Sequence, residues 1–135
     1  MSEPEHRVVP LPSSFELREG SLPITALTRI VIADEHEHDH QHDQTVNHLI
    51  GDVQRATGIH LARTATAAAG DIELRLDGDP GQLGPEGYAL DIDEQGATVR
   101  AATPHGVWNG TRTLVQLLPH TPVDTSLPFA HILDR

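Results

Sequence analysis

The sequence of 135 residues contains no cysteine and no lysine. Without cysteine the chain has no disulfides, no thiolate nucleophile and no cysteine-ligated zinc. It also lacks long apolar runs, because none approaches the roughly 18 residues that a membrane helix needs. The first six residues are acidic and have no apolar core like that of a secretory signal. We therefore expect no membrane partner, and the sequence assigns no cellular compartment.

Positive charge is scarce as well. All nine basic residues are arginine, and they face twenty acidic residues, which gives a net charge of −11 with histidine neutral. Nucleic acids and anionic membranes are bound through clustered positive charge. The composition therefore argues against both as partners, and the length corresponds to about one domain.

Alternating and helical patterns predict a series of short elements. Strands are expected over 28–33, 59–63, 72–76 and 129–133, with hairpins over 15–24 around Glu19-Gly20 and over 87–102 around 93–96. One helix is expected along the apolar stripe of 46–56, with Gly58 as its C-cap. A second helix is expected to begin at Thr103-Pro104 and to stop at Pro119. Residues 1–7 are predicted to be disordered and 8–134 to form one domain.

The order of these elements indicates the fold class. Strands and helices are grouped rather than strictly alternating, which favours an α+β fold. We expect a mixed, mostly antiparallel sheet with two helices packed on one face, as a two-layer structure.

A histidine-rich stretch at 33–45 raises the question of metal. It reads ADEHEHDHQHDQT, and residues 36–40 match the H-E-x-x-H pattern of zinc peptidases, with Glu37 as general base. If the backbone were extended instead, His36, His38, His40 and His42 would share one face and could bind zinc or nickel weakly. The flanking residues are polar and offer no apolar stripe to hold a catalytic helix on a core. We therefore favour a solvated loop, and these four histidines are weak metal candidates only.

No other catalytic group emerges from the residues. The carboxylates Asp77, Asp79, Asp91, Asp93 and Glu94 fall in polar turns or on open strand faces, where they are expected to be solvated. Ser13, Ser14, Ser21 and Ser126 lack the G-x-S-x-G context of a nucleophile elbow, and no phosphate-binding glycine motif occurs. We expect no catalytic residue, no substrate-binding residue and no cofactor in this chain.

Three segments nevertheless form a pattern. They are VVPLPSSFELREG, the stretch ELRLDGDPGQLGPEGYALDIDEQGATVRAATPHGVWNGTRTLVQLLP, and FAHILD. Together they resemble the domain that precedes the catalytic barrel in glycoside hydrolase family 20, the β-N-acetylhexosaminidases. Residues 83–88 resemble the L-G-x-E-G-Y motif of that family, and 106–118 resemble its helix G-x-x-x-G-x-x-T-L-x-Q-L-L.

The resemblance implies a zincin-like, two-layer fold without zinc and a non-catalytic role beside the barrel of the same protein. It also implies removal of terminal N-acetylhexosamine by the whole enzyme. In that family the substrate's own acetamido oxygen attacks the anomeric carbon, assisted by an adjacent Asp-Glu pair in the barrel. The present sequence reaches Arg135 within the motif that leads into the barrel, so the pair is expected to lie outside it and the chain alone to be inactive. The alternative is a free-standing metal-binding module that uses 36–42.

The last apolar stretch allows two interpretations. Leu127, Pro128, Phe129, Ile132 and Leu133 either form an exposed face that contacts a barrel or complete the sheet of this domain.

Overall fold

The computed structural model describes residues 14–32, 40–64, 66, 68–118 and 125–135, without the side chains of 40–43. Its elements follow in the order β1 (Ser14–Pro23), β2 (Arg29–Ile32), α1 (His40–Thr57), β3 (Ala62–Thr64), β4 (Ile72–Arg75), α2 (Pro80–Leu83), β5 (Tyr88–Asp93), β6 (Gly96–Ala101), α3 (Pro104–Leu117) and β7 (Ser126–Asp134). The strands form one seven-stranded sheet in the order β1-β7-β5-β6-β4-β2-β3.

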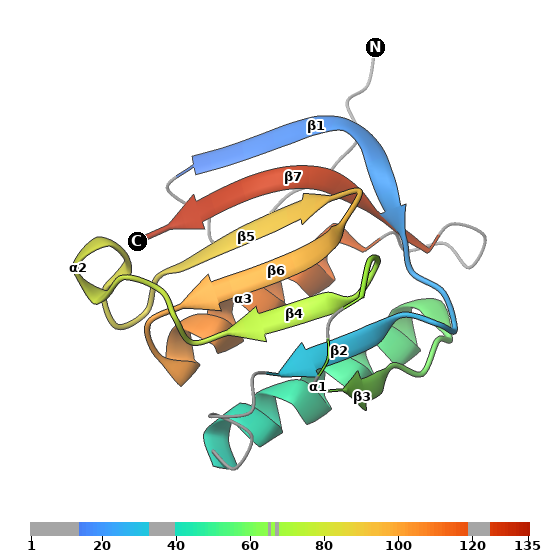
Figure 1. Ribbon diagram of the computed structural model, residues 1–135, viewed down its shortest axis with the longest axis horizontal. Helices are drawn as coiled ribbons and strands as arrows, with labels where there is room; N and C mark the ends of the chain where they lie inside the picture. Colours follow the sequence, from blue (N-terminus) through green and yellow to red (C-terminus); the bar gives the residue numbers. More distant parts are fainter. Residues whose placement is uncertain (1–13, 33–39, 65, 67, 119–124) are drawn as a thin grey trace.

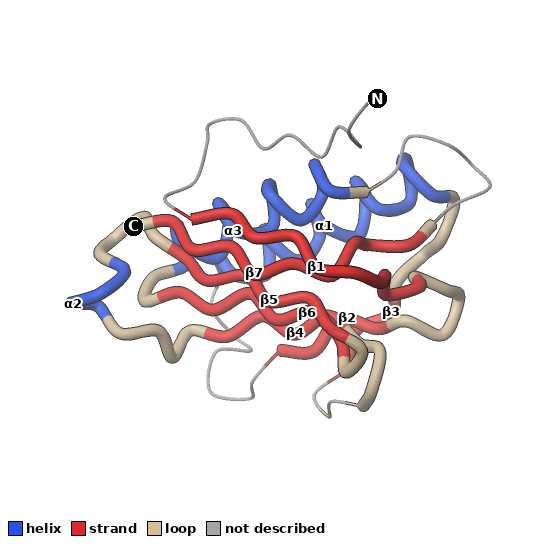
Figure 2. Tube along the Cα trace, turned by 90° about the horizontal axis from the view of Figure 1, so that it is seen from above, coloured by secondary structure: helices blue, strands red, loops and turns tan. Residues whose placement is uncertain are grey.

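The two long helices cover one face of this sheet. Figure 1 shows α1 and α3 behind the strands, and Figure 2 shows the same two layers from above. α3 packs on β5 and β6 and against α1. The α+β prediction with two helices on one face is therefore confirmed. The sheet is mixed, and most of its paired residues lie in the three antiparallel pairings, β1–β7, β5–β6 and β5–β7, as predicted.

The core lies between the layers. The apolar stripe of α1 supplies Val46, Leu49 and Val53, each fully buried, against strand residues such as Ile30 and Leu74. Gly58 follows α1 at a φ of +79° and donates its N–H to the carbonyl of Gln54, as its predicted C-cap role requires.

The start of α3 also follows the sequence. Thr103 is the N-cap, and its hydroxyl accepts a hydrogen bond from the Gly106 N–H at 3.0 Å. The helix ends at Leu117, and Leu118, which precedes Pro119, already has extended backbone.

Two sequence predictions about β1 and α1 were wrong. Residues 15–24 do not form a hairpin, because β1 runs through Gly20 with a register shift between Leu17 and Ser21 and pairs with β7 along its length. β7, which is distant in sequence, takes the hydrogen-bonding position that the second strand of a hairpin would have taken. In addition, α1 begins at His40, six residues before the apolar stripe, so part of the histidine-rich stretch is helical.

Other differences are smaller. A one-turn helix, α2, follows Asp79, whose carboxylate accepts the Gly81 N–H at 3.0 Å and caps it. β7 lies inside the sheet between β1 and β5, with Leu127 and Ile132 fully buried, so the last apolar stretch completes the sheet. The predicted disorder of 1–7 lies outside the described residues.

Candidate functional site

The loop of residues 84–87 lies over the first turns of α3 and forms one wall of a groove. The Thr103 hydroxyl donates to the carbonyl of Pro85 at 2.6 Å, and the side-chain amide of Asn109 donates to the carbonyl of Glu86 at 2.9 Å. Two side chains of one helix end therefore hold two successive carbonyls of the loop.

Close backbone contact completes this junction. A Cβ added to Gly106 would lie 2.4 Å from the carbonyl oxygen of Gly87 and 2.7 Å from the Cβ of Ala101. A Cβ on Gly87 would lie 2.1 Å from the oxygen of Leu83 and 2.6 Å from that of Asp134. The backbones of the loop, α3 and the end of β7 thus meet at distances that only glycine permits.

A buried hydroxyl pair forms the floor. Tyr88 begins β5 with 2 % of its surface exposed, and its hydroxyl lies 2.5 Å from the hydroxyl of Thr113 on α3. Burial raises the pKa of Tyr88, the hydrogen bond with Thr113 opposes that rise, and the nearby Asp134 adds to it. This tyrosine therefore stays neutral and joins the sheet to the helix.

The groove between these parts has a volume of about 690 Å³. Its lining comes from the loop, from α3 through Asn109 and Thr113, and from Asp134 and Arg135 at the end of β7. Glu86 and His105 stand on its rim with exposed side chains. The groove therefore joins polar side chains from three segments that are distant in sequence.

Arg112 connects the groove with α1. Its guanidinium carbon lies 4.7 Å from the centre of the Trp108 ring, a cation–π arrangement. Its Nη2 also donates to Asp52 on α1, which binds Arg55 as well. Burial alone would raise the pKa of Asp52. The hydrogen bonds and positive charges of Arg112 and Arg55 outweigh this effect, so the pKa is lowered.

On the opposite face of the sheet the charged side chains are paired with one another. Arg75 binds Asp77 at 2.6 Å and Glu73 at 3.1 Å, and Arg100 donates to Asp77 at 2.9 Å. The hydrogen bonds from Arg75 and Arg100 lower the pKa of Asp77 against the opposing effect of burial. A general acid would need a raised pKa instead, so Asp77 is suited to a structural ion pair and not to acid catalysis.

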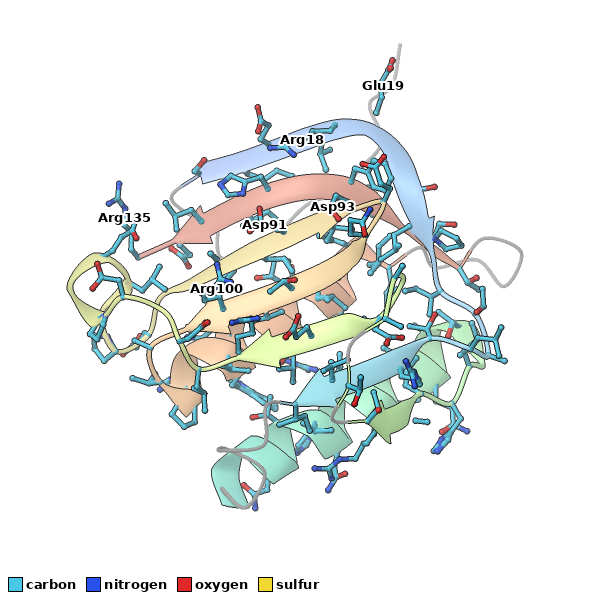
Figure 3. The ribbon with its side chains drawn as sticks, viewed as in Figure 1. Arg18, Glu19, Asp91, Asp93, Arg100 and Arg135 are labelled. Atoms are coloured by element: carbon cyan, nitrogen blue, oxygen red, sulfur yellow. The ribbon has the colours of Figure 1, made fainter. Side chains whose placement is uncertain are left out.

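Of the remaining carboxylate candidates, Asp91 and Asp93 have structural partners, and Glu94 lies exposed in the turn between β5 and β6. Asp91 pairs with His131 across β5 and β7, and Figure 3 shows Asp91 and Asp93 on the face away from the helices. The carboxylate of Asp93 accepts the Gln95 N–H at 2.8 Å within the β5–β6 turn. The structure does not bring these carboxylates together as an acid–base pair. Ser14, Ser21 and Ser126 lie in the paired strands β1 and β7, and Ser13 lies outside the described residues.

The histidine-rich stretch is only partly described. His36, Glu37 and His38 lie outside the described residues, whereas the backbone of His40 and His42 belongs to the first turn of α1. At these two positions the backbone is therefore helical and not extended. Within the described residues, no group of three or more histidine, aspartate or glutamate side chains is arranged to hold a metal ion.

The sequence did not reveal two features that the fold assembles. Asp71 is 6 % exposed and accepts hydrogen bonds from the Arg29 guanidinium at 3.0 Å, the Arg29 N–H at 3.1 Å and the Ala68 N–H at 3.0 Å. The second feature is the groove, whose loop and helix fall in the motifs at 83–88 and 106–118, although neither motif indicates a cavity between them. Both features depend on contacts between distant segments. In the part of the chain that the structure describes, no helix has the length and apolar character needed to span a bilayer.

Comparison with known proteins gives a consistent result. The model of the family described as "Glycosyl hydrolase family 20, domain 2" matches residues 5–135. The N-acetyl-β-hexosaminidase of Streptomyces plicatus is similar in structure at 32 % identity and a TM-score of 0.82, over 98 % of this chain and 26 % of that one. The β-N-acetylhexosaminidase of Streptomyces coelicolor A3(2) is similar at 32 % identity and a TM-score of 0.80, over 98 % and 27 % of the two chains.

A curated relative, the lacto-N-biosidase of Bifidobacterium bifidum, is 38 % identical over 72 residues, which is 52 % of this chain and 6 % of that protein. The chain thus spans about a quarter of the length of the two solved proteins and a much smaller part of the biosidase.

Proposed function

The chain belongs to glycosyl hydrolase family 20, as the non-catalytic domain that precedes the catalytic barrel in hexosaminidases, and we propose that the protein carrying it is a β-N-acetylhexosaminidase. The whole protein would hydrolyse terminal, non-reducing N-acetylhexosamine residues. The observation that supports this most is the match to the Streptomyces plicatus enzyme over 98 % of the chain.

Within that enzyme the present domain would stabilise the barrel and take no part in the reaction. Its ionic side chains support this assignment. Asp77, the carboxylate at the centre of the open-face network, has a lowered pKa and two arginine partners, so it is unsuited to donate a proton at neutral pH. The reaction would depend on a barrel Asp-Glu pair outside residues 1–135. We further propose that residues 8–134 act as a single unit.

A free-standing metal-binding module is not supported as the alternative. The family match extends over nearly the whole chain, including the histidine-rich stretch, and α1 interrupts the extended arrangement that the module needed. The four histidines at 36–42 remain unassigned.

Hydrolysis of a chromogenic aryl N-acetyl-β-glucosaminide tests the proposal. The full protein should release the aryl group, and a purified chain of residues 1–135 should release none. An inactive full protein would refute the hexosaminidase assignment. Hydrolysis by the 135-residue chain would refute the non-catalytic role of the domain.

A further inference from the structure

We propose that the free edge of β1 is a self-association surface, on which a second copy of this protein pairs antiparallel about a two-fold axis at Leu17. The partner is therefore another molecule with the same edge strand. The inference is independent of the enzymatic assignment, because it uses only the side chains and the outer edge of β1.

The sheet has one long edge and one short edge. β1 stands at one end of the strand order and, among the described strands, pairs only with β7. Figure 1 shows it as the outermost strand, on the side of the sheet opposite β3. β1 has ten residues, whereas β3 has three. An edge strand presents backbone donors and acceptors on its outer side, and a long one can accept the strand of another chain.

The charges of β1 are complementary to those of a second copy. In an antiparallel pair centred on Leu17, Glu16 of each copy lies directly opposite Arg18 of the other. Both side chains are more than half exposed, at 61 % for Glu16 and 54 % for Arg18. Within one chain they form a single contact at 3.3 Å, and a second copy adds two cross-strand pairs of opposite charge. Figure 3 shows Arg18 at this edge of the sheet.

The same charges disfavour the neighbouring symmetric registers. A two-fold axis at Glu16 would place two carboxylates opposite each other, and an axis at Arg18 would place two guanidinium groups opposite each other. Like charges that lie directly opposite are destabilising. Of these three registers, only the one centred on Leu17 joins opposite charges.

Leu17 supplies an apolar contact at the axis. Its side chain is 41 % exposed, and Leu27 is the only other large hydrophobic residue that is exposed among the described residues. Leu17 lies opposite the buried Ala130 of β7, so it projects from the other face of the strand than Glu16 and Arg18. Two copies would bring their Leu17 side chains together and remove apolar surface from water.

A register shift in β1 limits the length of this pairing. The shift lies between Leu17 and Ser21, and irregularities of this kind shorten the regular part of an edge. Pairing is therefore confined to the residues next to Leu17, and one short strand pair forms an interface at the low end of the size range. We expect a weak dimer, with a dissociation constant in the micromolar range.

Sedimentation velocity of the full protein tests the proposal without any substitution. Between about 1 and 500 μM the wild type should change from monomer to dimer. A protein that stays monomeric at the upper concentration would overturn the proposal.

Two charge reversals provide matched variants. Glu16→Arg and Arg18→Glu should each weaken self-association about tenfold, because each places like charges opposite each other twice. An equimolar mixture of the two variants should associate as strongly as the wild type, since every cross-strand pair then joins an arginine to a glutamate. A dimer that both reversals leave unchanged would overturn the proposal, and so would a mixture that associates no better than its components.

Crosslinking tests the position of the axis. Residues 1–135 contain no cysteine, so Leu17→Cys introduces a single thiol into this domain. Residues directly opposite in antiparallel strands have Cα atoms about 4.5–5.5 Å apart, which suits a disulfide. Mild oxidation of the full protein should therefore link Leu17→Cys into a covalent dimer that a reductant separates.

Ser14→Cys is the control for this crosslink. In the proposed register Ser14 lies opposite Gly20 of the second copy, so the two Ser14 positions are about 20 Å apart and should not be linked. Wild-type protein treated in parallel gives the background from any thiol outside residues 1–135. Crosslinking of both variants to the same extent, or of neither, would overturn the axis at Leu17.

Discussion

Gly106 in the first turn of α3 provides a sharp test of the packing between α3 and the 84–87 loop. From helix propensity alone, Gly106→Ala should be stabilising, because alanine is favoured over glycine by up to about 1 kcal/mol in a helix. The structure predicts the opposite. The new methyl group would lie 2.4 Å from the Gly87 oxygen and 2.7 Å from the Cβ of the fully buried Ala101.

Neither neighbour is free to move away. The loop that carries Gly87 is tied to α3 through the carbonyls of Pro85 and Glu86, which accept hydrogen bonds from Thr103 and Asn109. Overpacking of this kind typically costs about 1–3 kcal/mol, and more where backbone must shift. Because both contacts are far shorter than van der Waals distance, we take the upper end of this range. After subtraction of the propensity gain, we expect Gly106→Ala to lower the free energy of unfolding by about 2 kcal/mol.

Gly51 in α1 is the matched control. A Cβ there would have the end of the exposed Arg55 side chain as its nearest neighbour, 3.4 Å away. Gly51→Ala should therefore show the propensity effect alone and raise stability by about 0.5–1 kcal/mol.

The assay is thermal unfolding followed by circular dichroism, in which 1 kcal/mol corresponds to roughly 3–6 °C for a domain of this size. The two variants should shift the midpoint in opposite directions. A Gly106→Ala protein as stable as the wild type would refute the close packing of α3 against the loop. Equal destabilisation by both variants would refute the argument from local contacts.

Three further substitutions test buried polar contacts. Tyr88→Phe should cost about 1 kcal/mol by removing the hydrogen bond with Thr113. Because burial raises the pKa of Tyr88, the unfolded chain ionises first when the pH rises above 10.0, and the wild type should lose stability there. The Tyr88→Phe variant should lose less stability over the same pH range. Equal pH dependence of the two thermal midpoints above pH 10.0 would contradict this. Asp52 has a lowered pKa, so its contribution to the free energy of unfolding is present above pH 3.8 and disappears as the pH falls through the folded-state pKa. Urea titrations of Asp52→Asn should therefore show a smaller loss of stability at acid pH than those of the wild type. An unchanged acid loss would exclude the ion pair with Arg112 as its source. Asp71→Ala should lower the unfolding free energy by about 1–3 kcal/mol, because it removes the buried acceptor of three part-buried hydrogen bonds. An unchanged midpoint in denaturant titration would count against that network.

Local chemistry in the sequence determined the elements and most of their limits. Gly58 ends α1 because a left-handed C-cap suits glycine, and Thr103-Pro104 begins α3 because the hydroxyl caps the helix and proline fits its first position. Alternation over 88–92 and 98–101 predicted the β5–β6 hairpin, since both strands bury one face only. The motifs at 83–88 and 106–118 also identified the family correctly, as the match over residues 5–135 shows.

Only the tertiary structure decided which distant segments meet. The 15–24 hairpin failed because β7, more than a hundred residues away, supplies hydrogen-bond partners on both sides of Gly20. Arg112 and Asp52 lie on different helices, and their ion pair follows from the packing angle of α1 on α3, which side-chain periodicity does not encode. The groove likewise needs the loop, α3 and the end of β7 at once. Periodicity specifies which face of an element is buried, but the choice of partner depends on the summed packing of the whole chain.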